Sequence, residues 1–471
     1  MRKTSKVMLC LLLVGSILSA CSGGNKENVE SSPKNTKNTK SEEKSEKKIT
    51  LKIHYPTPDL KEARVTEDDK IKRFQAEYPN VEILKDDWQY NVSEIGVKMA
   101  SNEAPTYFNT FATEAQFLAE KGWLADITEL YNKWEFKDEM NPLLQNQFIV
   151  NGKVLGITQN GYITSTIVNK KMLDEKGVAI PPYEWTWADM LSTAKGVSDP
   201  SKGIAGIAPM GKGNEAGWNW TNFLFQAGGE IQTVADGKVT AAFNSEAGLK
   251  ALDFYRQLRW EAKAIPQDWA LGWGDAVGAF QQSRTAMVIA GASDVIEPAL
   301  NQGGLKPEDV LTFPMPAAEK GGKHTGILGG NYLVINPNAT PDEQEMAFRY
   351  ITYDYFSDKG LEALEADIKQ RKTDGKYFVP PLLQYFNADS KFGAKVKAIY
   401  DKYDNVYQYD PAIMGLLDGK PEAQYNTQDY YATMSSVIQE LFSKEGLDLK
   451  STLEKASKLV QEKFFDSITV E

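Results

Sequence analysis

Short apolar runs flank one amphipathic stretch where the body of this chain begins, and this order constrains the fold most. Ile49, Leu51 and Ile53 alternate with polar residues, which predicts a strand. Residues 68–78 repeat large apolar side chains at spacings of three and four, which predicts a helix. Residues 81–84 predict a second strand. A strand, a helix and a strand in this order begin a parallel sheet, so the predicted fold class is α/β.

The same pattern continues along the body. Further strands are predicted at 107–111, 154–157, 167–168, 287–289 and 332–335. Asn244 is predicted to cap a helix that carries Leu249, Leu252, Tyr255 and Leu258 on one stripe. Late helices are predicted at 342–356, 428–442 and 449–465. The body from Ile49 to Glu471 is long for one hydrophobic core, so two lobes are expected.

The N-terminus has the pattern of a secretory signal. Arg2, Lys3 and Lys6 precede an apolar run over residues 7–18, and small residues follow it. Twelve apolar residues are too few to cross about 30 Å of hydrocarbon at about 1.5 Å per residue, so an uncleaved membrane helix is disfavoured. Residues 1–20 are therefore predicted to be a signal peptide.

Cys21 directly follows Leu18-Ser19-Ala20, which resembles the bacterial lipobox. This resemblance implies that a diacylglyceryl group is attached to Cys21 and that Cys21 becomes the new N-terminus. Two acyl chains hold a protein stably at a membrane, whereas one does so marginally. Residues 22–48 carry almost no large apolar side chain, so residues 21–48 are predicted to be a lipidated cysteine and a disordered tether.

Composition excludes several classes of protein. Cys10 and Cys21 are the two cysteines of the chain, so the mature fold has no internal disulfide and no thiolate metal site. The formal charge of −11 becomes −14 when the three basic residues of the signal are removed. Nucleic acid is therefore disfavoured as a partner, because binding phosphates needs a basic face.

Several segments, in their order and spacing, resemble the bacterial extracellular solute-binding proteins of family 1, which are the carbohydrate receptors of ABC importers. The segments that carry the resemblance are 74–83 (FQAEYPNVEI), 122–127 (GWLADI), 151–157 (NGKVLGI), 181–190 (PPYEWTWADM), 280–287 (FQQSRTAM), 313–316 (FPMP) and 329–331 (GGN). Each match is short, and together they span nearly the whole body.

The resemblance implies a two-lobed periplasmic-binding-protein fold of type II, with hinge crossings and a cleft between the lobes. The crossings are expected near residues 157–162 and 329–334. The implied N-terminal lobe is 49–157 plus 331–390, and the implied C-terminal lobe is 158–330 plus 391–471. Hinge closure around a ligand suits this arrangement.

The implied function is a lipid-anchored receptor, not an enzyme, that captures a carbohydrate and delivers it to the membrane subunits of an ABC importer. Long aromatic loops favour an oligosaccharide. The receptor is expected to be a monomer without a cofactor or a metal ion. The anchor and tether favour the outer face of the cytoplasmic membrane, in a bacterium without an outer membrane.

Sugar recognition uses flat apolar faces for the ring and polar side chains for its hydroxyls, so aromatic residues beside polar groups are the pattern to find. Trp218 and Trp220 lie in the densest such segment, Gly-Trp-Asn-Trp. Trp273 and Asp275 lie in a second glycine-flanked segment. All four are candidate ligand contacts, although packing in the core is the commoner role of a single tryptophan.

Loops after predicted strands supply further candidates, because such loops open toward a ligand crevice in parallel sheets. Trp88 and Glu114 follow strands in this way. Their alternatives are a core contact for Trp88 and a solvated helix N-terminus for Glu114. Asp294 follows the strand predicted at 287–289, and the resemblance implies that it lies near the place where family members have a ligand-contacting aromatic residue, where a carboxylate could bond sugar hydroxyls. Tyr162 and Asn331 lie at the two crossings that the resemblance implies.

Tyr430 is a candidate by resemblance alone. The segment Asp429-Tyr430-Tyr431 resembles the aromatic pair with which maltodextrin receptors stack on sugar. Tyr430 is the chosen contact, because Tyr431 could equally face the helix bundle.

Catalytic chemistry has little support in the sequence. His54 and His324 are the only histidines, and zinc-protease, nucleophile-elbow and Walker motifs are absent. Asp401, Asp404 and Asp410 fit no EF-hand spacing. Two alternatives stay open: a binding module of another sort, which captures a peptide or a polyamine or reports to a sensor kinase, and a surface glycosidase.

Overall fold

The computed structural model describes residues 47–470. The predicted signal peptide, Cys21 and most of the predicted tether lie outside the described residues. From Lys47 onward the chain forms one unit. None of the helices in this described part combines the length and the apolar character that a membrane-spanning segment needs.

The first sheet begins as the sequence predicts. Strand β1 (Ile49–His54) pairs in parallel with β2 (Val81–Asp86) and with β3 (Tyr107–Phe111). Helix α1 (Lys61–Glu77) connects β1 to β2, and it starts earlier than predicted. The alternation in β1 is confirmed, since Leu51 and Ile53 are fully buried. A strand whose inward residues are large and apolar gains most of its stability from this burial.

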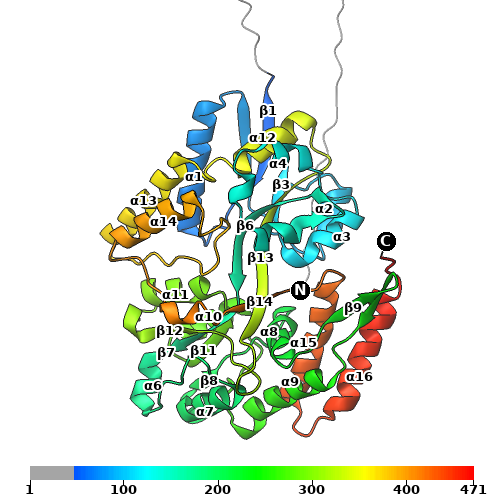
Figure 1. Cartoon of the computed structure of the whole chain (residues 1–471), viewed down its shortest axis with the longest axis vertical. Coiled ribbons are helices and arrows are strands. Elements are labelled where there is room, and N and C mark those ends of the chain that lie inside the picture. Colours follow the sequence, from blue (N-terminus) through cyan, green and yellow to red (C-terminus); the bar gives the residue numbers. More distant parts are fainter. Residues whose placement is uncertain (1–46, 471) are drawn as a thin grey trace, which may run out of the picture. The chain divides into compact units, whose positions relative to one another are not determined.

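Three further strands complete this sheet, whose path is β14-β13-β3-β1-β2, with β6 paired to β13 off that path. Strand β13 (Thr325–Ile335) runs antiparallel to β3 and parallel to β14 (Asp418–Pro421) along one edge. On its other edge it runs antiparallel to β6 (Ile157–Ile163). Figure 1 shows β6 and β13 side by side. The two segments that the family resemblance marks as crossings are therefore hydrogen-bonded neighbours.

The second sheet has four strands in the order β12-β7-β11-β8. They are β12 (Val310–Phe313), β7 (Ser165–Asn169), β11 (Thr285–Ala290) and β8 (Ala205–Ile207). Every residue of β7, β11 and β8 is buried, as is usual for strands covered on both faces. The remaining strands form two hairpins, β4 (Ile149–Val150) with β5 (Lys153–Val154) and β9 (Gln232–Ala235) with β10 (Lys238–Ala241).

Sixteen α-helices are found among residues 47–470, which confirms the α/β class. After α1 they are α2 (Ile95–Ala100), α3 (Ala115–Glu120), α4 (Thr128–Lys133), α5 (Pro142–Gln145), α6 (Lys170–Lys176), α7 (Trp187–Val197), α8 (Glu215–Gln226), α9 (Glu246–Arg256), α10 (Trp273–Gln281), α11 (Ala292–Asn301), α12 (Pro341–Ile351), α13 (Asp358–Thr373), α14 (Lys391–Lys402), α15 (Thr427–Ser443) and α16 (Leu449–Val460).

Each sheet has its own apolar core. Leu51 and Ile53 of the first sheet pack in one cluster with Phe392 and Val396 of α14. Met287 and Ile289 of the second sheet pack in another cluster with residues of α7, α8, α9 and α15. Residues 391–402 thus pack with the first sheet, although they follow all four strands of the second sheet in the sequence.

Two further helix boundaries differ from the predictions. Ser245 caps α9, because its side chain accepts a hydrogen bond from the backbone N–H of Gly248, whereas Asn244 was the predicted cap. Helix α12 ends at Ile351, short of the predicted end at residue 356. Residue Phe356 has a positive φ of 57°, which a continuing helix cannot contain.

Candidate functional site

The pairing of β6 with β13 places four side chains on one face. Tyr162 pairs with Gly329, and Asn160 pairs with Asn331. Residues two apart on a strand point to the same face, so these positions share one side of the sheet. Phe111 of β3 pairs with Asn331 from the other edge, and its side chain is 38% exposed. We call Phe111, Asn160, Tyr162 and Asn331 the crossing floor.

The ring of Tyr162 lies across the bare position of Gly329. A Cβ added to Gly329 would stand 2.4 Å from the Tyr162 hydroxyl oxygen and 2.9 Å from Oε2 of Glu422. Trp218 of α8 meets Tyr162 edge to face, with the ring centroids 6.1 Å apart. A Cβ at Gly291 would similarly meet both Tyr162 and Asp294. Tyr162 is therefore flanked by one tryptophan and two carboxyl groups.

Glu422 follows β14 and reaches the floor near Gly329. Its Oε1 accepts a hydrogen bond of 2.6 Å from the hydroxyl of Tyr431 on α15. The pKa of Glu422 is raised to about 7, mainly by burial and also by the charge of Glu114, although the hydrogen bond from the Tyr431 hydroxyl opposes the increase. The carboxyl group thus titrates near neutral pH.

Glu114 lies three residues after the end of β3, in a short 3-10 helix (Ala112–Glu114), and only 3% of it is exposed. It accepts a hydrogen bond of 2.5 Å from the hydroxyl of Tyr90. Burial raises the pKa of Glu114, and the nearby charge of Asp429 raises it as well. Burial also raises the pKa of Asp429. Glu114 therefore interacts with acids on two other segments, Glu422 after β14 and Asp429 on α15.

Asp294 lies in the first turn of α11. Its side chain is exposed to water, although protein atoms surround the carboxyl group. The pKa of Asp294 is raised to about 6, mainly by burial and also by the charge of Glu297, although the hydrogen bond from Ser293 opposes the increase. We call Glu114, Asp294, Glu422 and Asp429 the crossing carboxyls. None of the ion pairs that residues 47–470 form includes any of these four.

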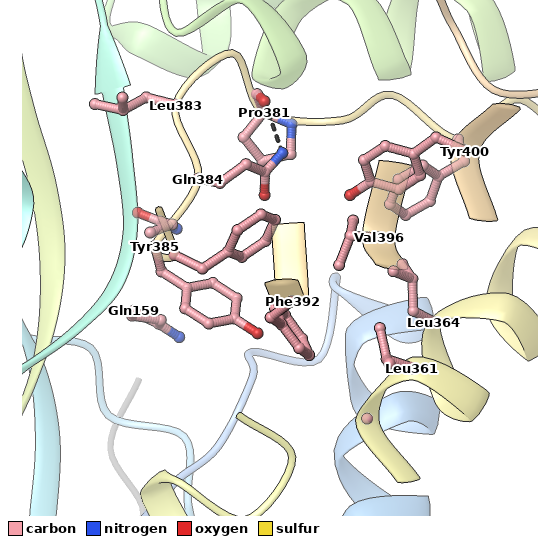
Figure 2. Close-up of a pocket in the computed structure, with 14 residues that line it drawn as sticks. Gln159, Leu361, Leu364, Pro381, Leu383, Gln384, Tyr385, Phe392, Val396 and Tyr400 are labelled. Atoms are coloured by element: carbon pink, nitrogen blue, oxygen red, sulfur yellow. Dashed lines mark hydrogen bonds between the residues drawn. The ribbon is translucent and has the colours of Figure 1, made fainter. Parts of the chain in front are cut away.

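A cavity of about 250 Å³ adjoins β6 on the edge away from β13. Figure 2 shows Gln159 of β6, Tyr385 and Phe392 around it. Side chains of α13, α14 and residues 378–386 supply a mostly apolar lining. Asn160 also borders this cavity, so the cavity and the crossing floor share a residue. An apolar space beside polar groups suits a small organic ligand.

The structure brings five of the sequence-predicted residues to the crossing site. Tyr162 and Asn331 belong to the floor, and Trp218 contacts Tyr162. Glu114 and Asp294 are two of the crossing carboxyls. The amide of Asn331 donates a hydrogen bond of 2.8 Å to Oδ1 of Asn160, which fixes the two amides together.

Two predicted residues lie in the core of the second sheet. Trp220 is fully buried, because it faces inward from α8. Tyr430 is also fully buried, packs against Phe243 and shares a hydrogen bond of 3.0 Å with Thr221. Tyr431, the neighbour that was not chosen, is the residue whose hydroxyl reaches Glu422.

Three other predicted residues have different partners. Trp88 donates from Nε1 to Glu94 and packs beside Tyr90. Trp273 is 37% exposed at the start of α10. Asp275 accepts hydrogen bonds from the Lys212 ammonium at 2.7 Å and from the Gly272 backbone, so it caps α10. Among the described residues, no hydrogen bond, ion pair or ring contact joins Trp88, Trp273 or Asp275 to the crossing floor.

Sequence reasoning missed the site residues Phe111, Asn160, Glu422, Asp429 and Tyr431. Phe111 and Asn160 could have been found from the predicted strands, had the strand register been known. Glu422 carries no local signal, because Gly329 and Tyr162, which place it at the floor, lie about 90 and 260 residues away in the chain. Among the described residues, no cluster of three or more His, Cys, Asp or Glu could hold a metal ion.

Comparisons with known proteins agree with this architecture. Residues 57–355 match the family model described as bacterial extracellular solute-binding protein. No protein of curated function matches the sequence.

Solved structures of similar fold include three bound to sugars. One is an ABC transporter solute-binding protein of Thermotoga lettingae with α-D-tagatose, with 21% identity over 88% of this chain and 99% of that chain, at a TM-score of 0.64. A second is an ABC substrate-binding protein of Listeria monocytogenes in complex with cycloalternan. It shares 17% sequence identity, the match covers 88% of this chain and 98% of that chain, and the TM-score is 0.66. The third is maltose-bound MalE3 of T. maritima. It shares 17% sequence identity, the match covers 88% of this chain and 99% of that chain, and the TM-score is 0.65. The predicted two-lobed fold is thereby confirmed.

Proposed function

The chain belongs to the bacterial extracellular solute-binding proteins, and from that premise we propose that it captures a carbohydrate at the crossing site and delivers it to the membrane subunits of an ABC importer. The crossing floor is the observation that carries this proposal. It sets an exposed aromatic ring, Phe111, beside the amides of Asn160 and Asn331 and the hydroxyl of Tyr162. Rings can cover the apolar face of a sugar, while amides and hydroxyls bond its hydroxyl groups.

Sugars bound to proteins of the same fold support the choice of ligand class. Tagatose, cycloalternan and maltose are the ligands of the three similar structures. The cavity beside Asn160 adds about 250 Å³ next to the floor, which favours a ligand longer than one sugar ring. The family consists of binding proteins, so we expect capture and release without turnover.

We place the hinge between lobes at β6 and β13. The proposed N-terminal lobe is 49–157 plus 331–390, and the proposed C-terminal lobe is 158–330 plus 391–471, with one adjustment. Because Phe392 and Val396 pack with the first sheet, we assign α14 (Lys391–Lys402) to the N-terminal lobe. Paired strands that connect two bodies can bend together, which suits closure around a ligand.

We further propose that the mature chain is a monomer held at the outer face of the cytoplasmic membrane by a lipid on Cys21. The lipobox-like Leu18-Ser19-Ala20-Cys21 supports this anchor. Radiolabelled palmitate should be incorporated into the wild-type chain in a bacterial host. The Cys21→Ala chain should take up no label and should appear in the medium, whereas equal labelling of both chains would contradict the proposal.

The function is tested with the mature chain made without lipid, as Cys21→Ala. Its melting temperature and tryptophan fluorescence are followed against monosaccharides, oligosaccharides, peptides and spermidine. A ligand at 100 times its dissociation constant should add about 2.7 kcal/mol of stability. A shift with one sugar class and no product formed supports the receptor. A shift with peptide alone, or release of reducing sugar, would contradict it.

Trp218 offers a site-specific version of this test. Trp218→Ala should weaken sugar binding at least about tenfold, or about 1.4 kcal/mol, because it removes the ring that contacts Tyr162. Trp123→Ala is the matched control, since Trp123 is also half-buried and packs on Phe117, outside the floor. Equal losses in both variants would point to general destabilisation and against a role at the crossing site.

A further inference from the structure

The crossing carboxyls bring four acidic groups to one site without a matching cation. The nearby cations are engaged elsewhere. The ammonium of Lys420, two residues before Glu422, bonds to Glu230 at 2.6 Å and to the Gly229 carbonyl at 3.2 Å. Arg371 bonds to Glu297 at 2.6 Å and to Asp367 at 2.9 Å. The protein therefore does not neutralise this site from within its described residues.

Tyrosine hydroxyls are the main donors to the two glutamates. Tyr431 donates to Glu422 and Tyr90 donates to Glu114. Each hydroxyl gives one hydrogen bond and no positive charge. Oε2 of Glu422 points toward the bare face of Gly329, beside the Tyr162 hydroxyl, and accepts no hydrogen bond from residues 47–470. One carboxylate oxygen is thus free on the floor itself.

Aromatic rings lie beside these carboxyl groups. Tyr162 is flanked by Glu422 near its hydroxyl and by Asp294 near its Cβ, and the rings of Tyr162 and Trp218 meet in a T-shaped contact with an interplanar angle of 81°. Carboxylates make strong charge-assisted hydrogen bonds with ammonium groups, and tyrosine and tryptophan faces attract cations. The aromatic rings and the carboxyl groups therefore favour an ammonium group independently of each other.

A neutral sugar would leave most of this negative charge uncompensated. Its hydroxyls could donate hydrogen bonds to the carboxylates, but a partly buried carboxylate still lacks an opposite charge. The pKa values of Glu422 and Asp294 are raised because burial disfavours their charged forms and no cation offsets that effect in the free protein. A positively charged ligand would supply what the site lacks.

Resting on the carbohydrate-receptor function proposed above, we infer that the ligand is a carbohydrate that carries a protonated amino group. The ammonium lies beside the Tyr162 hydroxyl, where the free Oε2 of Glu422 is placed to bond it, and Asp294, near the Cβ end of the same side chain, adds to the negative field. Glu114 and Asp429 add to the negative field from the segments after β3 and at the start of α15. The uncharged part of the sugar lies over Phe111, Asn160 and Asn331.

The test uses sugars that differ only at one substituent. The mature Cys21→Ala chain is titrated calorimetrically with the β-1,4 trisaccharide of glucosamine, its fully N-acetylated form and cellotriose. The monosaccharide pairs glucosamine with glucose and galactosamine with galactose extend the panel, and spermidine tests the amine without a sugar. The aminated members should bind at least about tenfold tighter than their neutral partners. Their affinity should fall severalfold from low to high salt, because added salt screens charge attraction.

Glu422→Gln should remove most of the preference for the aminated sugar while keeping the side chain's shape. Glu440→Gln is the control, since it removes the same charge from an exposed position on α15. Neutral sugars that bind as tightly as their aminated partners would overturn the inference and leave the receptor function standing. Spermidine binding without any sugar binding, or no response to any aminated sugar, would overturn the inference and count against the receptor function as well.

Discussion

Gly329 shows how one missing side chain shapes the crossing site. The Tyr162 ring and the Glu422 carboxylate both approach the space that a Cβ would fill. The glycine is needed here for close approach and not for its backbone angles. A larger residue would push the ring off the floor and move the free oxygen of Glu422.

Gly329→Ala should therefore weaken ligand binding more than it weakens the fold. We expect at least about a tenfold loss of affinity, or about 1.4 kcal/mol, because the ring and the carboxylate both have to move. Calorimetric titration with the ligand found above measures the loss, and thermal melting measures stability.

Gly278→Ala is the matched control for this substitution. A Cβ at Gly278 meets no atom within 4 Å, and alanine favours the helix that contains it by about 0.5–1 kcal/mol. This variant should bind normally and melt slightly higher. Unchanged affinity in Gly329→Ala would show that the Tyr162 ring does not position the ligand.

The sequence predicted which types of residue line the site, but it did not always predict which side chain points to the site and which points into the core. Trp218 and Trp220 are two positions apart on α8, so they face different ways, and Trp220 turns into the core while Trp218 meets Tyr162. Tyr430 and Tyr431 divide in the same way, with Tyr431 reaching Glu422. The sequence pairs carry the same residue types, and only the packing of α8 on α15 decides which member reaches the site.

Helices α8 and α15 meet at the scale of whole elements, and this contact positions two site residues. A Cβ on Gly217 of α8 would stand 2.3 Å from the carbonyl oxygen of Tyr431 and 2.8 Å from its Cα. The backbone N–H of Gly217 also donates to the Ser435 hydroxyl at 2.9 Å. The two helices therefore pack backbone to backbone, which places Trp218 and Tyr431 on adjoining surfaces.

Gly217→Ala should separate these helices, because backbone atoms cannot yield as a flexible side chain does. Overpacking of this kind costs about 1–3 kcal/mol, so the free energy of unfolding should fall by that amount. Urea denaturation measures it. Affinity should also fall, since Tyr431 and Trp218 move apart. A variant as stable as the wild type would show that α8 and α15 are not held this closely in solution.

Elements with a strong apolar pattern were predictable, and elements held by distant partners were not. Helix α15 (Thr427–Ser443) lies within a residue of its prediction, because buried side chains recur along its length. Helix α13 buries only Leu361 and Ile368 in 16 residues, so its stripe is too sparse to detect. Strand β14 reads Asp-Gly-Lys-Pro and has no strand pattern; its pairing with β13 makes it a strand.

The resemblance to a family supplied what local pattern could not. The pairing of β6 with β13 joins residues about 170 positions apart, and no periodicity encodes that contact. The crossings were expected near these strands because the motifs around them match the family in order. Of the crossing carboxyls, Glu114 and Asp294 were candidates from the sequence, whereas Glu422 belongs to no recognised motif and Asp429 was noted only as the neighbour of the chosen Tyr430.

At the scale of the whole molecule, the buried acids couple folding to pH. The groups that face Glu422 are Glu114, Tyr162, Tyr332 and Tyr431, and none of them is a cation. Burial raises the pKa of Glu422 to about 7, above the value of about 4.3 expected for an unfolded chain. The folded state therefore binds more protons than the unfolded state between these values, so its stability falls as pH rises.

The wild-type chain should lose stability relative to Glu422→Gln as the pH rises from 4.5 to 8. The contribution of the protonated carboxyl is fully present below about pH 4 and is lost as the pH passes 7. At about 1.36 kcal/mol per pKa unit, and with discount for partial solvent access, the change should be about 1–3 kcal/mol. Glutamine cannot titrate, so the difference between the two urea-denaturation free energies isolates this group from the rest of the acidic surface. A difference that stays constant with pH would mean that Glu422 is already ionised in the free protein, and that a nearby cation compensates it.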